Sequence, residues 1–263
     1  GLGFSVANFL YVIILTVIFY PLLVNKFKKN ILNKSIYRSL FLIYTISFLV
    51  YRFTKPDHIY FVPFDTMYFL MVILFAKDFA FLAAVMAMTY LFPIIGYDPV
   101  FVIVTFLVCL MGSYLIEKVT TRQELIALGM KLAVTKFFLY LLLTYFIGRE
   151  QNLVVLQSGE IVISGLLSGM LAIAALPYFE RTFNILTTFR LLELGDLSHP
   201  LLKLLSMKAP GTFHHSMMVA TLSEAAAEAI GANAIFARVA SYYHDIGKMK
   251  RPKFYVENQE GGE

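Results

Sequence analysis

The chain has 263 residues, of which 59% are hydrophobic and 15% are charged. A soluble globular domain has about 45–50% apolar and about 25% charged residues. The composition therefore excludes an ordinary water-soluble domain and predicts a membrane protein. The net charge of +5 does not indicate a DNA or RNA duplex as a partner, because in a membrane protein the distribution of charge over the loops says more than its total.

Seven apolar segments are candidates for membrane-spanning helices, since a helix needs about 17–25 predominantly apolar residues to cross the hydrocarbon core. The third and fourth segments are separated only by the charged pair Lys77 and Asp78, and one helix through both would be too long for one bilayer. The predicted spans are Phe4–Val24, Ile36–Phe53, Ile59–Phe75, Phe79–Ile95, Val100–Ile116, Leu132–Ile147 and Ile161–Phe179.

The basic residues predict the orientation of these spans. Nine Lys and Arg residues lie in or beside the first, third and fifth loops, and three lie on the opposite side. Positive charge favours the cytoplasmic side, so we expect the N-terminus to lie outside the cell and the C-terminal tail to lie in the cytoplasm. The nine are Lys26, Lys28, Lys29, Lys34, Arg38, Lys77, Lys118, Arg122 and Lys131, and the three are Arg52, Lys55 and Arg149.

Two ionisable residues fall within predicted spans. Asp65 lies in the outer part of the third span, and Lys136 lies near the inner end of the sixth. Because these positions are in opposite leaflets, we expect that the two residues are not partners. Lys136 can extend its ammonium to the cytoplasmic headgroups. For Asp65, a structural polar contact and a ligand-binding or signalling role remain alternatives.

The seventh predicted span carries two glycines four residues apart, Gly165 and Gly169. Small residues at this spacing let two helix backbones approach closely. We expect this face to be buried against another helix, either within the chain or at the seam of a homodimer. The spans carry neither a chain of charges nor Gly/Pro-broken half-helices at repeated positions, which argues against a transporter.

The composition changes after Glu180, and the pattern predicts shorter, more polar helices. An amphipathic helix is predicted over Arg181–Leu194 as a continuation of the seventh span. A short helix over Leu201–Ser206 and a turn at Ala209–Gly211 follow. A long helix from near Thr212 to Ile230 and a second helix from about Asn233 to Ile246 complete the tail, with Gly231 as the C-terminal cap of the first and Gly247 at the end of the second.

The candidate catalytic and metal-binding residues lie on these last two helices. His214 and His215 stand near the start of the long helix, and His244, Asp245 and Lys248 stand at the end of the second. Imidazole and carboxylate are the ligands of Mn, Fe or Zn. An adjacent His-Asp pair can bind one ion through the ring and bridge a second through the carboxylate, which is the arrangement of two-metal phosphate chemistry. Lys248 can neutralise a phosphate oxygen as a point charge.

The segments around these residues resemble one family. They are Ala209-Pro-Gly-Thr-Phe-His-His-Ser-Met-Met-Val-Ala220, Tyr242-Tyr-His-Asp-Ile-Gly-Lys-Met-Lys-Arg-Pro252 and Glu257-Asn-Gln259. Together they resemble the bacterial seven-transmembrane HD-hydrolase receptors, which include the PgpH-type cyclic-di-AMP phosphodiesterases. The resemblance covers residues 199–259, and the seven predicted spans match the family in pattern more than in motif.

The resemblance implies a reaction and a role for each residue. The family hydrolyses cyclic di-AMP to the linear dinucleotide pApA at a site with two divalent metal ions, for which Mn or Fe is expected. Carried over by motif, His215 and His244 are metal ligands, and Asp245 is a metal ligand and catalytic residue that bridges the two ions. Lys248 would contact a phosphate or support a ligand. His214 receives no ligand role.

The sequence also departs from the family. The later histidines and the final aspartate that complete both metal spheres are absent, and so is the large extracellular domain that precedes the spans. We therefore expect a piece of a longer protein, shortened at both ends, that has no hydrolase activity alone.

The sequence as a whole predicts an all-α protein with three parts. These are a seven-helix transmembrane domain over residues 1–180, a helical linker over 181–198 and the N-terminal part of a cytoplasmic HD domain over 199–263. The leading hypothesis is a membrane-bound cyclic-dinucleotide phosphodiesterase controlled by its sensor part. The alternative is a non-enzymatic receptor whose HD domain only relays a signal. The expected partners are a cyclic dinucleotide, the lipid bilayer and a second copy in a homodimer.

Overall fold

A computed structural model of the chain describes residues 10–19, 21, 33–75, 77–93, 96, 98–116, 119 and 121–259. The described residues are mainly helical and contain no strand, which confirms the predicted all-α class. The chain divides into two compact units, Gly1–Ile185 and Leu186–Glu263, and each is described by itself.

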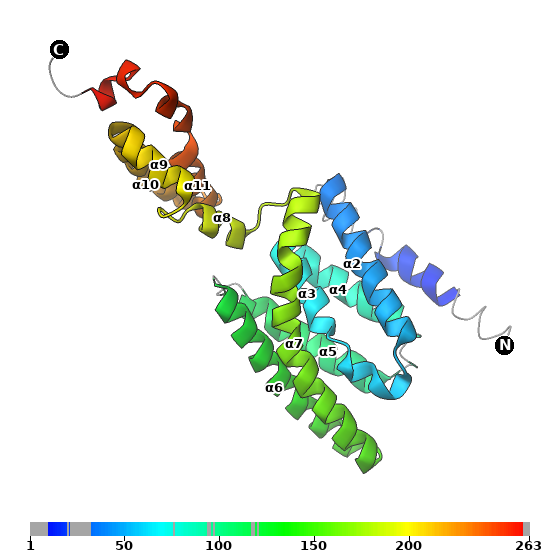
Figure 1. The fold of residues 1–263 in the computed structure, drawn as a ribbon. Helices are drawn as coiled ribbons and strands as arrows, with labels where there is room; N and C mark the ends of the chain where they lie inside the picture. Colours follow the sequence, from blue (N-terminus) through cyan, green and yellow to red (C-terminus); the bar gives the residue numbers. More distant parts are fainter. Residues whose placement is uncertain are drawn as a thin grey trace. The chain divides into compact units, whose positions relative to one another are not determined.

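Unit 1 is a bundle in which α7 packs against both α6 and α3 (Figure 1). By length and hydropathy, three of the described helices can cross a membrane, namely α2, α6 and α7. The count of seven spans stays a prediction, and much of the first span, its basic loop and the end of the fourth span lie outside the described residues. The helices are Leu10–Phe19, α2 (Lys34–Phe53), the 3-10 helix η1 (Pro56–Phe61), α3 (Phe64–Leu74), α4 (Lys77–Leu91), α5 (Pro99–Leu115), α6 (Arg122–Ile147) and α7 (Gln151–Phe183).

The separation of the third and fourth predicted spans is confirmed, because α3 ends at Leu74 and α4 begins at Lys77. The predicted start of the third span at Ile59 is wrong. Pro56–Phe61 form η1, and Pro63 is the N-cap of α3, which has only 11 residues. At 1.5 Å per residue this helix is about 16 Å long, roughly half of the hydrocarbon core.

The helix that contains the sixth predicted span begins earlier than the sequence predicted. The structure starts α6 at Arg122 instead of Leu132, because Thr121 and Glu124 form a reciprocal capping box that satisfies two backbone donors at the helix start. The Glu124 N–H donates to Thr121 Oγ1 at 3.2 Å, and the Thr121 N–H donates to Glu124 Oε2 at 3.0 Å. The helix therefore places Lys136 near its middle instead of at its inner end.

The glycine face of α7 is buried against α6 of the same chain, which confirms close packing within the chain. A Cβ on Gly165 would lie 2.0 Å from the Cβ of Ala133, and one on Gly169 would lie 2.9 Å from the Cα of Ile126. A Cβ on Gly129 would lie 3.1 Å from the carbonyl oxygen of Gly165. Because α6 occupies this face, it is not the seam of a homodimer.

Replacing Gly165 and Gly169 together with Leu should separate α6 from α7, because neither side chain fits between backbones that are already in contact. We expect a lower thermal-unfolding midpoint in detergent. Gly159→Leu, on the same helix but with open space around its Cβ position, is the matched control. Equal midpoints for the two variants would contradict this packing.

The expectation that Asp65 and Lys136 are not partners is wrong. Lys136 Nζ donates to Asp65 Oδ2 at 3.4 Å, and both side chains are buried, with exposed fractions of 0% and 3%. Hydropathy placed the two residues in opposite leaflets because it started the sixth span at Leu132, which put Lys136 near the inner end of its helix instead of near the middle. With α3 beginning at Phe64 and α6 at Arg122, the two side chains meet inside the bundle.

Unit 2 contains four helices and three short 3-10 helices among its described residues. The predicted single helix over Arg181–Leu194 is wrong. The helix α7 ends at Phe183, Asn184 adopts a left-handed conformation with φ 51°, and α8 begins after its N-cap Thr187. The elements are α8 (Thr188–Leu194), α9 (Pro200–Lys208), α10 (Pro210–Ala229), α11 (Ala234–Tyr243), η3 (Ile246–Lys250), η4 (Pro252–Phe254) and η5 (Val256–Asn258).

Two local predictions in unit 2 also change. The segment Ala209–Gly211 is the first turn of α10 instead of a separate turn, since Pro210 occupies the first helical position, where a missing N–H costs nothing. The helix α11 ends at Tyr243 and not at Ile246, and the chain continues as η3. The predicted cap at Gly231 is confirmed by its positive φ of 67°.

Candidate metal centre

Two neighbouring helices bring the predicted metal ligands together. His215 lies in the second turn of α10, and His244 and Asp245 follow the last turn of α11. The helices α10 and α11 pack against each other, and the ring centroids of His215 and His244 are 5.7 Å apart. The ligand atoms of His215, His244 and Asp245 all lie within 4.8 Å of one another. Among the described residues, this is the group of three whose donor atoms could bind one metal ion.

The ring of His244 is oriented by the backbone. Its Nδ1 lies 2.7 Å from the carbonyl oxygen of Ser241, and because a carbonyl only accepts, Nδ1 carries the proton. In the neutral ring, Nε2 is then the nitrogen with a free lone pair, and it lies 3.3 Å from Asp245 Oδ2. A histidine that donates one ring N–H to a carbonyl and presents its other nitrogen is in the usual orientation of a metal ligand.

The three donors fit a divalent metal ion in chemistry and in position. Two imidazoles and one carboxylate suit Mn, Fe or Zn. His215 and His244 are exposed and Asp245 is half-buried, so solvent and a substrate can reach the group. Three protein ligands are about the number that a catalytic ion needs, and a second ion would need donors beyond these three.

Lys248 lies beside the group but is held by two carboxylates. Its Nζ is 2.8 Å from Asp245 Oδ2 and 2.7 Å from Glu257 Oε1. Hydrogen bonds to Asp245 and then Glu257 raise the pKa of Lys248 to about 12, and the bond from Lys248 lowers the pKa of Glu257. Lys248 is therefore charged across the physiological range, in a position to orient Asp245 as well as to meet an anion.

Sequence reasoning gave no role to the residues that connect η5 to the start of α10. The Thr212 N–H donates to Asn258 Oδ1 at 3.0 Å, and Asn258 Nδ2 donates to Thr212 Oγ1 at 2.7 Å. The Thr212 hydroxyl donates to Glu257 Oε1 at 3.1 Å. These bonds join three parts of the site, because Glu257 also binds Lys248. Only the resemblance, which included the sequence Glu257-Asn-Gln259, singled out this segment in advance.

His214 stands apart from the group. It is exposed, and its ring contacts that of the neighbouring Phe213 at a centroid distance of 6.1 Å. His199 is the N-cap of α9, and its ring packs edge-on against Tyr243 at 6.0 Å. His199 therefore stabilises the approach of α9 to the end of α11.

Gly211 is required where η5 touches α10. A Cβ at this position would lie 1.7 Å from the carbonyl oxygen of Glu257 and 2.4 Å from its carbonyl carbon. Gly211→Ala should therefore displace the segment that contains Glu257 and Asn258, at a cost of about 1–3 kcal/mol, the usual range for overpacking.

Hydrogen exchange of the amides over residues 252–259 is the measurement for Gly211→Ala, and we expect faster exchange there than in the wild type. Gly247→Ala, whose Cβ position has open space around it, is the control and should leave that exchange unchanged. Unaltered exchange in Gly211→Ala would show that η5 does not pack on α10 in this way.

Comparisons with known proteins agree with the geometry. Residues 4–187 match the family model described as 7TM receptor with intracellular HD hydrolase, and residues 212–262 match that of the HD domain. The chain is 44% identical over 153 residues to the cyclic-di-AMP phosphodiesterase PgpH of Bacillus subtilis, covering 56% of this chain and 21% of the relative. The protein of the same name from Listeria monocytogenes is 48% identical over 124 residues, covering 46% of this chain and 17% of the relative.

The matched region is thus about a fifth of the length of these curated relatives. No solved structure gave a significant match to the chain.

Proposed function

We propose that this chain, which belongs to the family of 7TM receptors with an intracellular HD hydrolase, carries the membrane part and a section of the catalytic part of a metal-dependent phosphodiesterase. It is a membrane protein, and two of its relatives are named as cyclic-di-AMP phosphodiesterases. The observation that carries the proposal is the convergence of His215, His244 and Asp245 within 4.8 Å, inside the segment that matches the HD domain.

The proposed roles follow from the positions of the side chains. His215 and His244 would bind a divalent metal ion through unprotonated ring nitrogens, and Asp245 would bind it through a carboxylate oxygen and bridge to a second ion. Metal ions at such sites supply an activated water and neutralise phosphate charge. Lys248 would keep Asp245 oriented and contact a phosphate oxygen of the substrate. The expected ions are Mn or Fe, and the expected reaction is hydrolysis of cyclic di-AMP to pApA.

A non-enzymatic receptor is the alternative, in which the HD domain would relay a signal without hydrolysis. The orientation of His244 favours the enzyme. The hydrogen bond from Nδ1 to the Ser241 carbonyl oxygen presents Nε2 to a metal ion, and a site without catalysis does not need this orientation.

The complete protein that contains this chain, purified with Mn, is expected to release pApA from cyclic di-AMP, and EDTA should abolish the release. Residues 1–263 alone are expected to be inactive, because three donor residues do not complete two metal spheres. Absence of turnover by the complete protein with Mn or Fe would overturn the hydrolase. Turnover by residues 1–263 alone would overturn the requirement for further ligands.

The proposed orientation places the N-terminus outside the cell and the HD segment in the cytoplasm, as the nine-to-three distribution of basic residues favours. Single cysteines at Asn33 and Gln151, both exposed, should then differ in labelling by a membrane-impermeant maleimide on whole cells. We expect label at position 151 and none at position 33 until the cells are lysed. The reverse pattern would invert the topology.

A further inference from the structure

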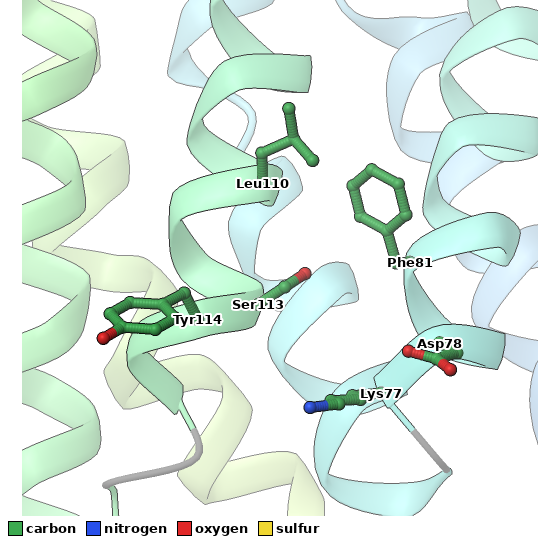
Figure 2. Close-up of a pocket in the computed structure, with 6 residues that line it drawn as sticks. All are labelled: Lys77, Asp78, Phe81, Leu110, Ser113 and Tyr114. Carbon is green, nitrogen blue, oxygen red and sulfur yellow. The ribbon is translucent and has the colours of Figure 1, made fainter.

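A pocket of about 270 Å³ lies between the first turn of α4 and the last turns of α5. The residues that line it include a charged pair and an apolar pair. Figure 2 shows the charged side chains of Lys77 and Asp78 together at one end and the apolar side chains of Phe81 and Leu110 at the other. Ser113 and Tyr114 complete the wall on α5. The volume is just below the range of about 300–1,000 Å³ that holds a whole drug-sized ligand, so the pocket suits one small polar group with the rest of the molecule outside.

The apolar end of the pocket continues into an exposed stripe along α5. The exposed residues recur at helical spacing and end at Tyr114 in the pocket wall, which is the pattern of a helix face that lies against hydrocarbon. Phe106 of this stripe contacts Phe81 of the pocket at a ring-centroid distance of 5.9 Å. The stripe consists of Ile103, Phe106, Leu107, Leu110, Met111 and Tyr114.

The pocket lies at a place along the helices where a membrane interface is expected. It stands at the C-terminal end of α5, where the apolar stripe ends and charged side chains begin. Tyr and Lys are the residues that occupy the headgroup level, since each has an apolar part and a polar tip. A molecule that fills the pocket and the stripe together must therefore be amphipathic, with a polar head of limited size and an extended apolar tail.

We propose that this pocket binds the headgroup of a zwitterionic phospholipid, phosphatidylethanolamine, with its acyl chains along the stripe on α5. The Lys77 ammonium meets the phosphate, and the Asp78 carboxylate meets the ethanolamine ammonium. The two side chains carry opposite charges, so a purely anionic headgroup such as phosphatidylglycerol is attracted by Lys77 and repelled by Asp78. The site lies in unit 1 and is independent of the hydrolase chemistry proposed for unit 2.

Native mass spectrometry of the complete protein in mild detergent, titrated with either lipid, tests the site. We expect phosphatidylethanolamine to bind roughly tenfold more tightly than phosphatidylglycerol, the scale of one charge-assisted contact. Lys77→Gln should weaken both lipids, and Asp78→Asn should weaken phosphatidylethanolamine alone and so remove the preference. The matched controls are Lys55→Gln and Glu150→Gln, which remove exposed charges elsewhere in unit 1 and should change neither affinity.

Three outcomes would overturn the proposal. The first is equal binding of the two lipids by the wild type, which needs no variant to fold. The second is an Asp78→Asn protein that keeps the preference. The third concerns the source of the headgroup: if glycerophosphoethanolamine, which has no acyl chains, competes as strongly as the lipid, the ligand is a soluble phosphate ester and the stripe on α5 has no part in binding.

Discussion

Asp245→Ala in the complete protein is expected to lower kcat for cyclic di-AMP by at least about 100-fold, the scale on which loss of one precisely placed charged group acts. His215→Ala should have an effect of similar size. The reason is geometric, since each residue supplies one of three donor atoms within 4.8 Å and two donors are fewer than a catalytic metal ion needs. Bound metal, measured by mass spectrometry of the dialysed protein, should fall together with activity.

The adjacent histidine is the control for this experiment. His214→Ala makes the same chemical change one residue earlier on α10, at an exposed side chain outside the donor group. We expect it to keep near-normal activity and metal content. Equal losses in His214→Ala and His215→Ala would mean that the substitutions act on the fold of α10 and not on a metal. Near-normal turnover by Asp245→Ala would exclude the bridging role.

The site could be predicted from the sequence to the extent that its residues are neighbours in the chain. His244 and Asp245 are adjacent, and the resemblance pairs them with His215, so the three donors could be named. The contacts made by Glu257 and Asn258 could not, because they depend on the chain returning to Thr212 after two short 3-10 helices. Neither hydropathy nor helical periodicity carries information about such a return.

The prediction of the fold from the sequence was limited in a similar way. Apolar length predicted where the long helices lie, because burial in hydrocarbon or in a core requires it. It did not predict where they begin, since the starts depend on single residues such as Pro63 and the capping box of Thr121 with Glu124. The start assigned to the sixth span, at Leu132 instead of Arg122, changed the inferred depth of Lys136 and so hid its contact with Asp65.

The buried pair of Asp65 and Lys136 leads to the second large effect. Both side chains are almost completely buried, and Asp65 Oδ1 has no hydrogen-bond partner among the described residues. Asp65 lies in the first turn of α3, where the helix dipole favours a negative charge. Even so, removing one partner leaves the other charge buried without compensation, which costs about 3–5 kcal/mol.

We therefore expect Asp65→Leu and Lys136→Met each to lower the thermal-unfolding midpoint in detergent markedly. The double variant should recover most of the loss, because an apolar pair of similar volume avoids the cost of desolvating two charges. Lys131→Met is the matched control, since Lys131 is an exposed lysine on the same helix, and it should change the midpoint little.

The wild type, the two single variants and the double variant form a double-mutant cycle. Their four unfolding midpoints show how strongly Asp65 and Lys136 interact. If the losses of the single variants simply add in the double variant, the two side chains do not interact, and the contact at 3.4 Å has no energetic consequence. If the double variant is as stable as the wild type, the pair is dispensable for stability. Signal-dependent control of phosphodiesterase activity in the complete protein, measured for that same double variant, would then show whether the ion pair is retained for a role in signalling.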